Sequence, residues 1–184
     1  MVKLWLGSIY GPVKDKDKDE FYKSKLLEAG SEISKMASSK DMIWIGIDAN
    51  SVMNEELDLV MIGGTEEDKK QKQNKVRKNG EPFRAWADWM DLQDIWRDRN
   101  ESKKKYTRVS WEDKEDNIGE HGRVSNRIDY IMTNELMAQM IKQTGIVPTS
   151  HFTWSSDHKV TWTEVTGLEK SKANTEKTKK ETNI

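Results

Sequence analysis

The chain has 184 residues with 31 basic and 32 acidic side chains, which give a formal net charge of −1. This length suits one domain, and the absence of cysteine excludes disulfides, Cys-ligated zinc and thiol catalysis. No apolar run reaches the roughly 20 residues of a membrane span, and no signal-peptide pattern follows Met1. We therefore expect no membrane partner, and an intracellular location rather than secretion. Because the net charge is close to zero, any binding of nucleic acid must come from a local basic patch.

The first half of the chain predicts two strands and two helices. Residues 2–10 are apolar on both faces near their middle, as in a central strand, and the apolar run 42–47 is typical of a buried strand. Between them, apolar residues recur every three or four positions over 20–37, which predicts an amphipathic helix. The almost entirely polar residues 64–81 favour a surface excursion, after which a second helix begins at Pro82.

The second half predicts a β-hairpin, with strands over 106–111 and 127–132 joined by the charged segment 112–123. A short helix and a last strand complete the pattern, at 134–142 and 159–165. Because strands and helices alternate early and a hairpin comes late, we expect a layered α/β domain with a mixed sheet.

Three polar clusters lie at or beside predicted strand ends, where a rigid sheet can present polar groups to a cleft. They are Asp48 with Asn50, Asp129 within an apolar run, and Ser156-Asp157-His158. A carboxylate among apolar residues is costly unless it is paired, and His158 is a natural partner for Asp129. Such a bond would fix the imidazole tautomer and raise the basicity of its second nitrogen. Hard carboxylate oxygens with an amide also suit Mg²⁺.

Each cluster taken alone also has a structural explanation. Asp48 and Asn50 favour turns, and Asp129 could be a buried structural acid. Ser156 and Asp157 could cap a turn, and the eight Trp are mostly expected in the core. The order and spacing of the clusters together are what favour a functional interpretation.

Six motifs occur in the order seen in the endonuclease/exonuclease/phosphatase superfamily, which the chain resembles from about residue 4 to residue 165. The nearest resemblance is to apurinic-type endonucleases and to the endonuclease domains of non-LTR retrotransposons. The motifs are Tyr10-Gly11-Pro12, Gly46-Ile47-Asp48-Ala49-Asn50, Leu92-Gln93-Asp94, Tyr106-Thr107, Ser125-Asn126-Arg127-Ile128-Asp129-Tyr130 and Ser155-Ser156-Asp157-His158. The last two are the most specific.

This resemblance implies a DNase I-like fold over residues 1–166, an α/β sandwich with two packed mixed or antiparallel sheets and outer helices. Residues 167–184 are almost devoid of apolar side chains, and we expect a disordered tail there. The family's principal Mg²⁺ ligand is a Glu on an early strand, preceded by an Asn on the first strand. Both would lie upstream of the strand that contains Tyr10. We therefore expect the chain to be the later part of such a domain, lacking the first strands, with an impaired metal site.

The resemblance also implies roles for five catalytic residues. Asp48 matches the residue that orients or deprotonates the attacking water, and Asn50 the one that helps hold the phosphate. Asp129 and His158 match the acid–imidazole pair at the scissile phosphate. Tyr10 matches a Tyr on the phosphate or leaving-group side.

Three further residues match supporting positions, namely the hydroxyls of Thr107 and Ser156 and a metal-site carboxylate at Asp157. The implied reaction is Mg²⁺- or Mn²⁺-dependent hydrolysis of a phosphodiester by in-line attack of water, with DNA as the favoured substrate. Two alternatives stay open. One is a phosphatase of the same superfamily, and the other is a catalytically inactive remnant that binds nucleic acid through basic runs at 69–70, 75–78 and 103–105. No oligomeric state is predicted.

Overall fold

The computed structural model describes residues 2–110, 123–151 and 156–167. Its largest sheet has four strands in the order β1-β2-β7-β4. β1 (Leu4–Tyr10) runs parallel to β2 (Met42–Asp48), whereas β7 (Asp129–Thr133) is antiparallel both to β2 and to β4 (Gln93–Asp94). The sheet is therefore mixed, as predicted.

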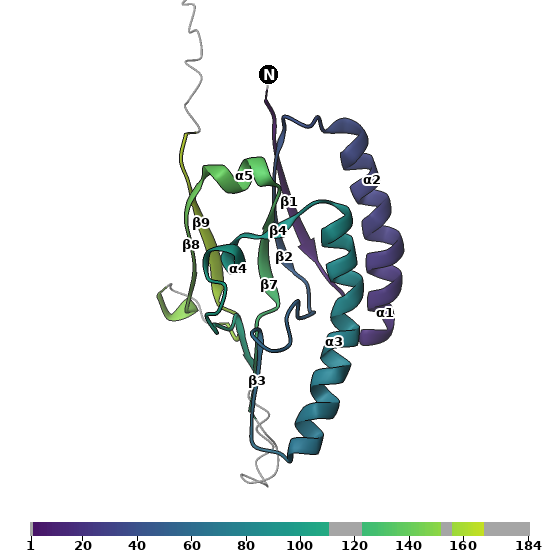
Figure 1. Ribbon diagram of the computed structural model, residues 1–184, viewed down its shortest axis with the longest axis vertical. Coiled ribbons are helices and arrows are strands. Elements are labelled where there is room, and N and C mark those ends of the chain that lie inside the picture. The colour runs from purple at the N-terminus through teal and green to yellow at the C-terminus, as the bar shows by residue number, and fades with distance from the viewer. Residues whose placement is uncertain (1, 111–122, 152–155, 168–184) are drawn as a thin grey trace, which may run out of the picture.

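Helices from the first half of the chain cover one face of this sheet (Figure 1). They are α1 (Asp15–Glu20), a π-helical segment (Phe21–Lys25), α2 (Leu26–Met36) and α3 (Glu66–Trp89). The core beneath them is apolar and rich in aromatic side chains, including Tyr22, Ile45, Ile47, Phe83, Trp86, Tyr130 and Met132.

The second face of the sheet packs against elements from later in the chain (Figure 1). They are α4 (Ile95–Arg99), α5 (Glu135–Met140), β8 (Ile141–Val147) and β9 (Val160–Val165), of which β8 and β9 pair antiparallel. Successive side chains of a strand point to opposite faces, so Ile131 enters this second core while Tyr130 and Met132 enter the first. Both faces of β7 are thus covered, which explains its uninterrupted apolar run.

The predicted hairpin between 106–111 and 127–132 is wrong. A separate antiparallel sheet has the order β3-β6-β5, in which β5 (Arg108–Ser110) and β3 (Leu59–Ile62) both pair with β6 (Arg123–Asn126). The chain then passes into β7, which joins β2 because its apolar residues need cover on both faces. β1 lies at the edge of the described sheet instead of its centre. The connector and the tail, residues 112–123 and 167–184, fall almost wholly outside the described residues.

The polar segment 64–81 is helical from Glu66 onward, which corrects the expected surface excursion. α3 begins with a capping box, in which Thr65 and Asp68 bond to each other's backbone N–H, and continues through Pro82. Lys69 pairs with Glu66 at 2.6 Å on its exposed surface. Such a helix shows no apolar stripe in its first turns because these turns extend beyond the sheet (Figure 1). None of the helices within the described ranges is long and apolar enough to cross a membrane.

A buried ionic cluster fixes the corner between β6 and β7. Arg127, which is 1% exposed, donates from Nε and Nη2 to the two carboxylate oxygens of fully buried Asp58, at 2.9 and 2.8 Å. Its Nη2 also lies 2.5 Å from Asp94 Oδ2, and Arg97 binds Asp58 as well. Two carboxylates and two guanidinium groups balance one another, as burial of charge requires.

We predict that Asp58→Asn lowers the free energy of unfolding by about 3–5 kcal/mol, because Arg127 keeps its charge in the interior with too little compensation. Urea denaturation measures this change. The matched control is Asp98→Asn, which breaks the exposed pair of Asp98 with Arg99 and is expected to cost less than about 1 kcal/mol. Equal losses in the two variants would contradict the structural role given to the buried cluster.

Asp41 ties the start of β1 to the start of β2. Its carboxylate accepts hydrogen bonds from the backbone N–H of Ser38 at 3.0 Å and of Lys3 at 3.0 Å, and from the Trp5 indole at 3.3 Å. These bonds favour the ionised form, with the Ser38 and Lys3 N–H groups contributing most, and hold the pKa of Asp41 well below its usual range.

A carboxylate with a lowered folded-state pKa stabilises the protein above the unfolded pKa of about 4, and this stabilisation is lost as pH falls further. We therefore predict that Asp41→Asn is less stable than the wild type at pH 7 and that the difference shrinks toward pH 2. Denaturant unfolding across this range measures the effect. Replacing the exposed Glu101 by Gln is the control, and a difference between wild type and Asp41→Asn that does not change with pH would contradict the prediction.

Candidate active site

The sheet brings three predicted site residues into one row. Tyr10 at the end of β1 lies opposite Asp48 at the end of β2, and Asp48 lies opposite Asp129 at the start of β7. Parallel strands end at the same sheet edge, and an antiparallel neighbour starts there. Residues distant in the sequence therefore meet at this edge.

Asp129 and His158 form the acid–imidazole pair that the sequence predicted. Nδ1 of His158 lies 3.1 and 3.0 Å from the two carboxylate oxygens of Asp129, and the side chains are 29% and 17% exposed. Residues around His158 are held against β5, since Lys159 N–H donates to the Thr107 carbonyl at 2.6 Å. With Nδ1 facing the carboxylate, Nε2 is the ring nitrogen left for a substrate.

Asp48 lies beside this pair in an environment that favours its neutral form. Burial raises the pKa of the Asp48 carboxyl, and the negative charge of Asp129 raises it further. A hydrogen bond from the Asn50 N–H to Oδ1, at 3.0 Å, and the charges of His158 and Arg108 oppose that rise. Asp48 therefore accepts a proton more readily than an ordinary surface carboxylate.

The turn after Asp48 is tight and conformationally strained. Asn50 has a φ of +46°, which is uncommon outside glycine, and its side-chain amide donates to the Gly11 carbonyl at 2.9 Å. Gly11 in turn donates to the Asp48 carbonyl at 2.7 Å. A Cβ at position 11 would lie 2.6 Å from both the Ala49 carbonyl and the Tyr22 hydroxyl, so only glycine allows this approach.

The two predicted supporting hydroxyls hold backbone rather than reacting groups. Thr107 is fully buried, and its Oγ1 accepts from the N–H groups of Ile128 and Asp129 at 3.0 and 3.1 Å. Ser156 Oγ accepts from the His158 N–H at 3.0 Å. Each hydroxyl therefore fixes the segment that carries one member of the acid–imidazole pair.

Asp157 and Tyr10 occupy different surroundings from the three central residues. The Asp157 carboxylate pairs with Arg108, whose Nε lies 3.1 Å from Oδ2, and this hydrogen bond lowers its pKa. Tyr10 lies at the correct strand end with 68% of its surface exposed. The metal role of Asp157 and the phosphate role of Tyr10 stay predictions. Arg108 was missed from the sequence, although it directly follows Thr107 of a recognised motif.

The central residues have the chemistry of a cation site. One ligand atom from each of Asp48, Asp129 and His158 lies within 4.8 Å of the others. Two adjacent carboxylates repel each other, and a divalent cation between them would remove that repulsion while accepting oxygen and imidazole donors. The donor set fits a divalent metal, without selecting a particular ion.

No family model matches the chain, and neither does any curated protein. Solved structures do. The 3′-5′ exonuclease of Neisseria meningitidis matches with a TM-score of 0.59 at 17% identity, over 82% of this chain and 54% of that one. An AP endonuclease from Archaeoglobus fulgidus matches with a TM-score of 0.57 at 13% identity, over 86% of this chain and 61% of that one.

The endonuclease domain of TRAS1, a telomere-specific non-LTR retrotransposon, matches with a TM-score of 0.55 at 15% identity, over 87% of this chain and 56% of that domain. The chain thus spans between about half and three-fifths of the length of these proteins. At such identities the likeness concerns the fold. The chain has the DNase I-like α/β fold of these nucleases, which confirms the predicted fold class.

Proposed function

We propose that the chain is a metal-dependent phosphodiesterase that cleaves DNA as an endonuclease. The observation that carries this proposal is the Asp129–His158 pair, at 3.0 Å, with Asp48 beside it in the same row of the sheet. The fold supports it, because proteins that share it include an AP endonuclease, a retrotransposon endonuclease domain and a 3′ phosphatase bound to product DNA.

In the proposed reaction, Asp48 is the base that takes a proton from the attacking water. Its raised pKa suits this role, because a carboxylate whose neutral form is favoured receives a proton more readily. As the new P–O bond forms, the opposite P–O bond breaks and its electron pair leaves with the sugar oxygen, which takes up a proton from solvent. Phosphate hydrolysis of this kind needs positioning and charge stabilisation more than covalent chemistry.

His158 contacts the phosphate where negative charge develops. Asp129 accepts from Nδ1–H of His158, and in the imidazolium form Nε2–H can donate a hydrogen bond to a non-bridging oxygen. Thr107 and Ser156 are positioning residues, since each anchors the backbone of this pair. Asn50 would place its amide near the same phosphate.

Asp129 would hold the divalent cation next to Asp48, with Asp157 as the further ligand that the sequence predicts. When bound, Mg²⁺ or Mn²⁺ supplies positive charge that neutralises the phosphate.

We predict that the purified chain nicks supercoiled plasmid in the presence of Mg²⁺ or Mn²⁺. Asp48→Asn and His158→Gln are expected to lower the nicking rate at least about 10²-fold, the usual contribution of a general base and of a hydrogen-bond donor to the developing charge, respectively. Gel separation of nicked from supercoiled plasmid measures the rate, and circular dichroism checks that each variant is folded.

Asp98→Asn, which changes an exposed carboxylate, is the control and should nick at the wild-type rate. A wild-type chain that leaves the plasmid uncut under every metal condition would refute the nuclease proposal. Salt-dependent DNA binding in that case would support the alternative of a non-catalytic nucleic-acid-binding protein.

A second prediction tests the metal without relying on activity. Saturating Mg²⁺ or Mn²⁺ should raise the wild-type unfolding temperature, since a ligand at 100 times its Kd stabilises by about 2.7 kcal/mol. The double variant Asp48→Asn/Asp129→Asn should lose this response, because it removes both carboxylates. Asp157→Asn tests the predicted third ligand. An unchanged response in the double variant would place the cation elsewhere.

A further inference from the structure

A hollow of about 240 Å³ adjoins the catalytic residues and shares two side chains with their surroundings. Asn50 lies in its wall and donates its backbone N–H to Asp48, and Arg108 lies in its wall and pairs with Asp157. The hollow therefore continues from the place where the scissile phosphate is proposed to bind. Its other walls come from the segment around Lys18, from α3 and from the end of β6.

The charge of this hollow is strongly unbalanced. Four cationic side chains and one carboxylate line it, a net charge of +3, and they are Lys18, Lys72, Lys75, Arg108 and Asp15. Asp15 is shared by two of these cations, since it lies 3.0 Å from the Nζ of Lys18 and 3.1 Å from that of Lys75, and Arg108 pairs with Asp157 just outside the hollow. Four cations against these two carboxylates leave an excess of +2. In a chain with a net charge of −1, such a concentration of positive charge beside the active site favours an anionic ligand.

One face of α3 supplies much of this wall. Lys72, Lys75, Val76 and Asn79 all line the hollow, and their spacing of three, four and seven residues puts them on the same side of the helix. Lys70 precedes Lys72 by two residues, which places it on a different, exposed side. Lys72 and Lys75 therefore face the hollow, whereas Lys70 lies on the other side of the helix.

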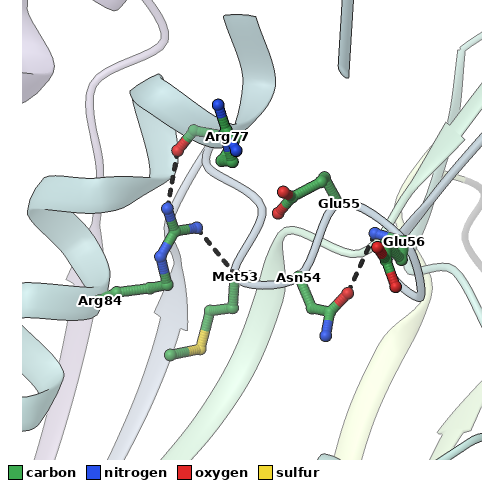
Figure 2. Close-up of a pocket in the computed structure, with 6 residues that line it drawn as sticks. All are labelled: Met53, Asn54, Glu55, Glu56, Arg77 and Arg84. Atoms are coloured by element: carbon green, nitrogen blue, oxygen red, sulfur yellow. Dashed lines mark hydrogen bonds between the residues drawn. The ribbon is translucent and has the colours of Figure 1, made fainter. Parts of the chain in front are cut away.

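A second hollow, of about 300 Å³, has a different character (Figure 2). Its two acidic residues, Glu55 and Glu56, balance its two arginines. Arg84 is already bound there, because its guanidinium donates to the carbonyls of Met53 at 2.9 Å and Arg77 at 2.7 Å, as Figure 2 shows. This hollow therefore has no net attraction for a polyanion.

We propose that the first hollow, here called the basic groove, binds a backbone phosphate of the DNA strand adjacent to the phosphate being cleaved. This proposal rests on the proposed nuclease function and adds a substrate requirement to it. A substrate must be a polynucleotide long enough to place a neighbouring phosphate against Lys72 and Lys75. A small phosphodiester can reach Asp48 and His158 but leaves the groove empty.

The experiment compares the wild type with Lys72→Gln/Lys75→Gln and with the single control variant Lys70→Gln. Fluorescence anisotropy of a labelled DNA duplex, recorded in EDTA at several salt concentrations, gives the binding constant without cleavage. The groove variant should bind at least tenfold more weakly at low salt. Its slope of log K against log salt should fall by about 0.9 in magnitude, which is the contribution of one neutralised phosphate. Lys70→Gln should match the wild type.

Hydrolysis of bis(p-nitrophenyl) phosphate separates this proposal from the proposed function. If both hold, the groove variant hydrolyses this small diester at the wild-type rate but nicks plasmid more slowly. Groove-dependent binding by a chain that cleaves no substrate would support the groove and refute the nuclease. A wild-type salt slope in the groove variant, an equal loss in Lys70→Gln, or no salt-dependent DNA binding at all would overturn the groove. The Lys75 side chain is 69% exposed, so its replacement should not disturb folding, which thermal unfolding verifies.

Discussion

The buried pairing of Arg127 with Asp58 is the interaction on which the rest of the site depends. A guanidinium that is 1% exposed must be compensated, and the two residues that compensate it come from separate segments, the one before β3 and the one before α4. Main-chain bonds add to it, because Arg127 N–H donates to the Asp58 carbonyl at 2.8 Å and Tyr130 OH donates to the Arg127 carbonyl at 2.6 Å. The chain direction at this corner is therefore determined two residues before Asp129.

The acid–imidazole pair of Asp129 and His158 is held in place by this corner. Asp129 leaves it with its backbone N–H bound to Thr107, and His158 is held on the strand segment that pairs beside Thr107. On the neighbouring strand, the side chain of Asn50 binds the Gly11 carbonyl, and this strained turn limits the orientation of Asp48. Buried polar groups and strain reduce stability in general, and here they coincide with the residues to which the proposed phosphate chemistry is assigned.

The near-zero net charge conceals a spatial separation of charge. Carboxylates gather at the sheet edge, where they suit a metal ion and a proton acceptor, and lysines gather in the basic groove next to it. Arg108 stands between the two, bound to Asp157 while its charge opposes the rise in the pKa of Asp48. The proposed polynucleotide substrate would span both regions, whereas the charges of these regions cancel when they are summed over the whole sequence.

The sequence alone predicted the strand that ends at Asp48, because an uninterrupted apolar run needs cover on both faces. The ordered motifs identified the Asp129–His158 pair. The sequence missed the first turns of α3, which extend past the sheet and carry no apolar stripe. It also misassigned the partner of residues 127–132 and gave no role to Asp58, which meets Arg127 across 69 residues. The periodicity of apolar residues along a segment indicates only which faces of that segment are buried. Strand pairing, the ionic cluster and the basic groove arise from contacts between distant segments, so only the tertiary structure decided them.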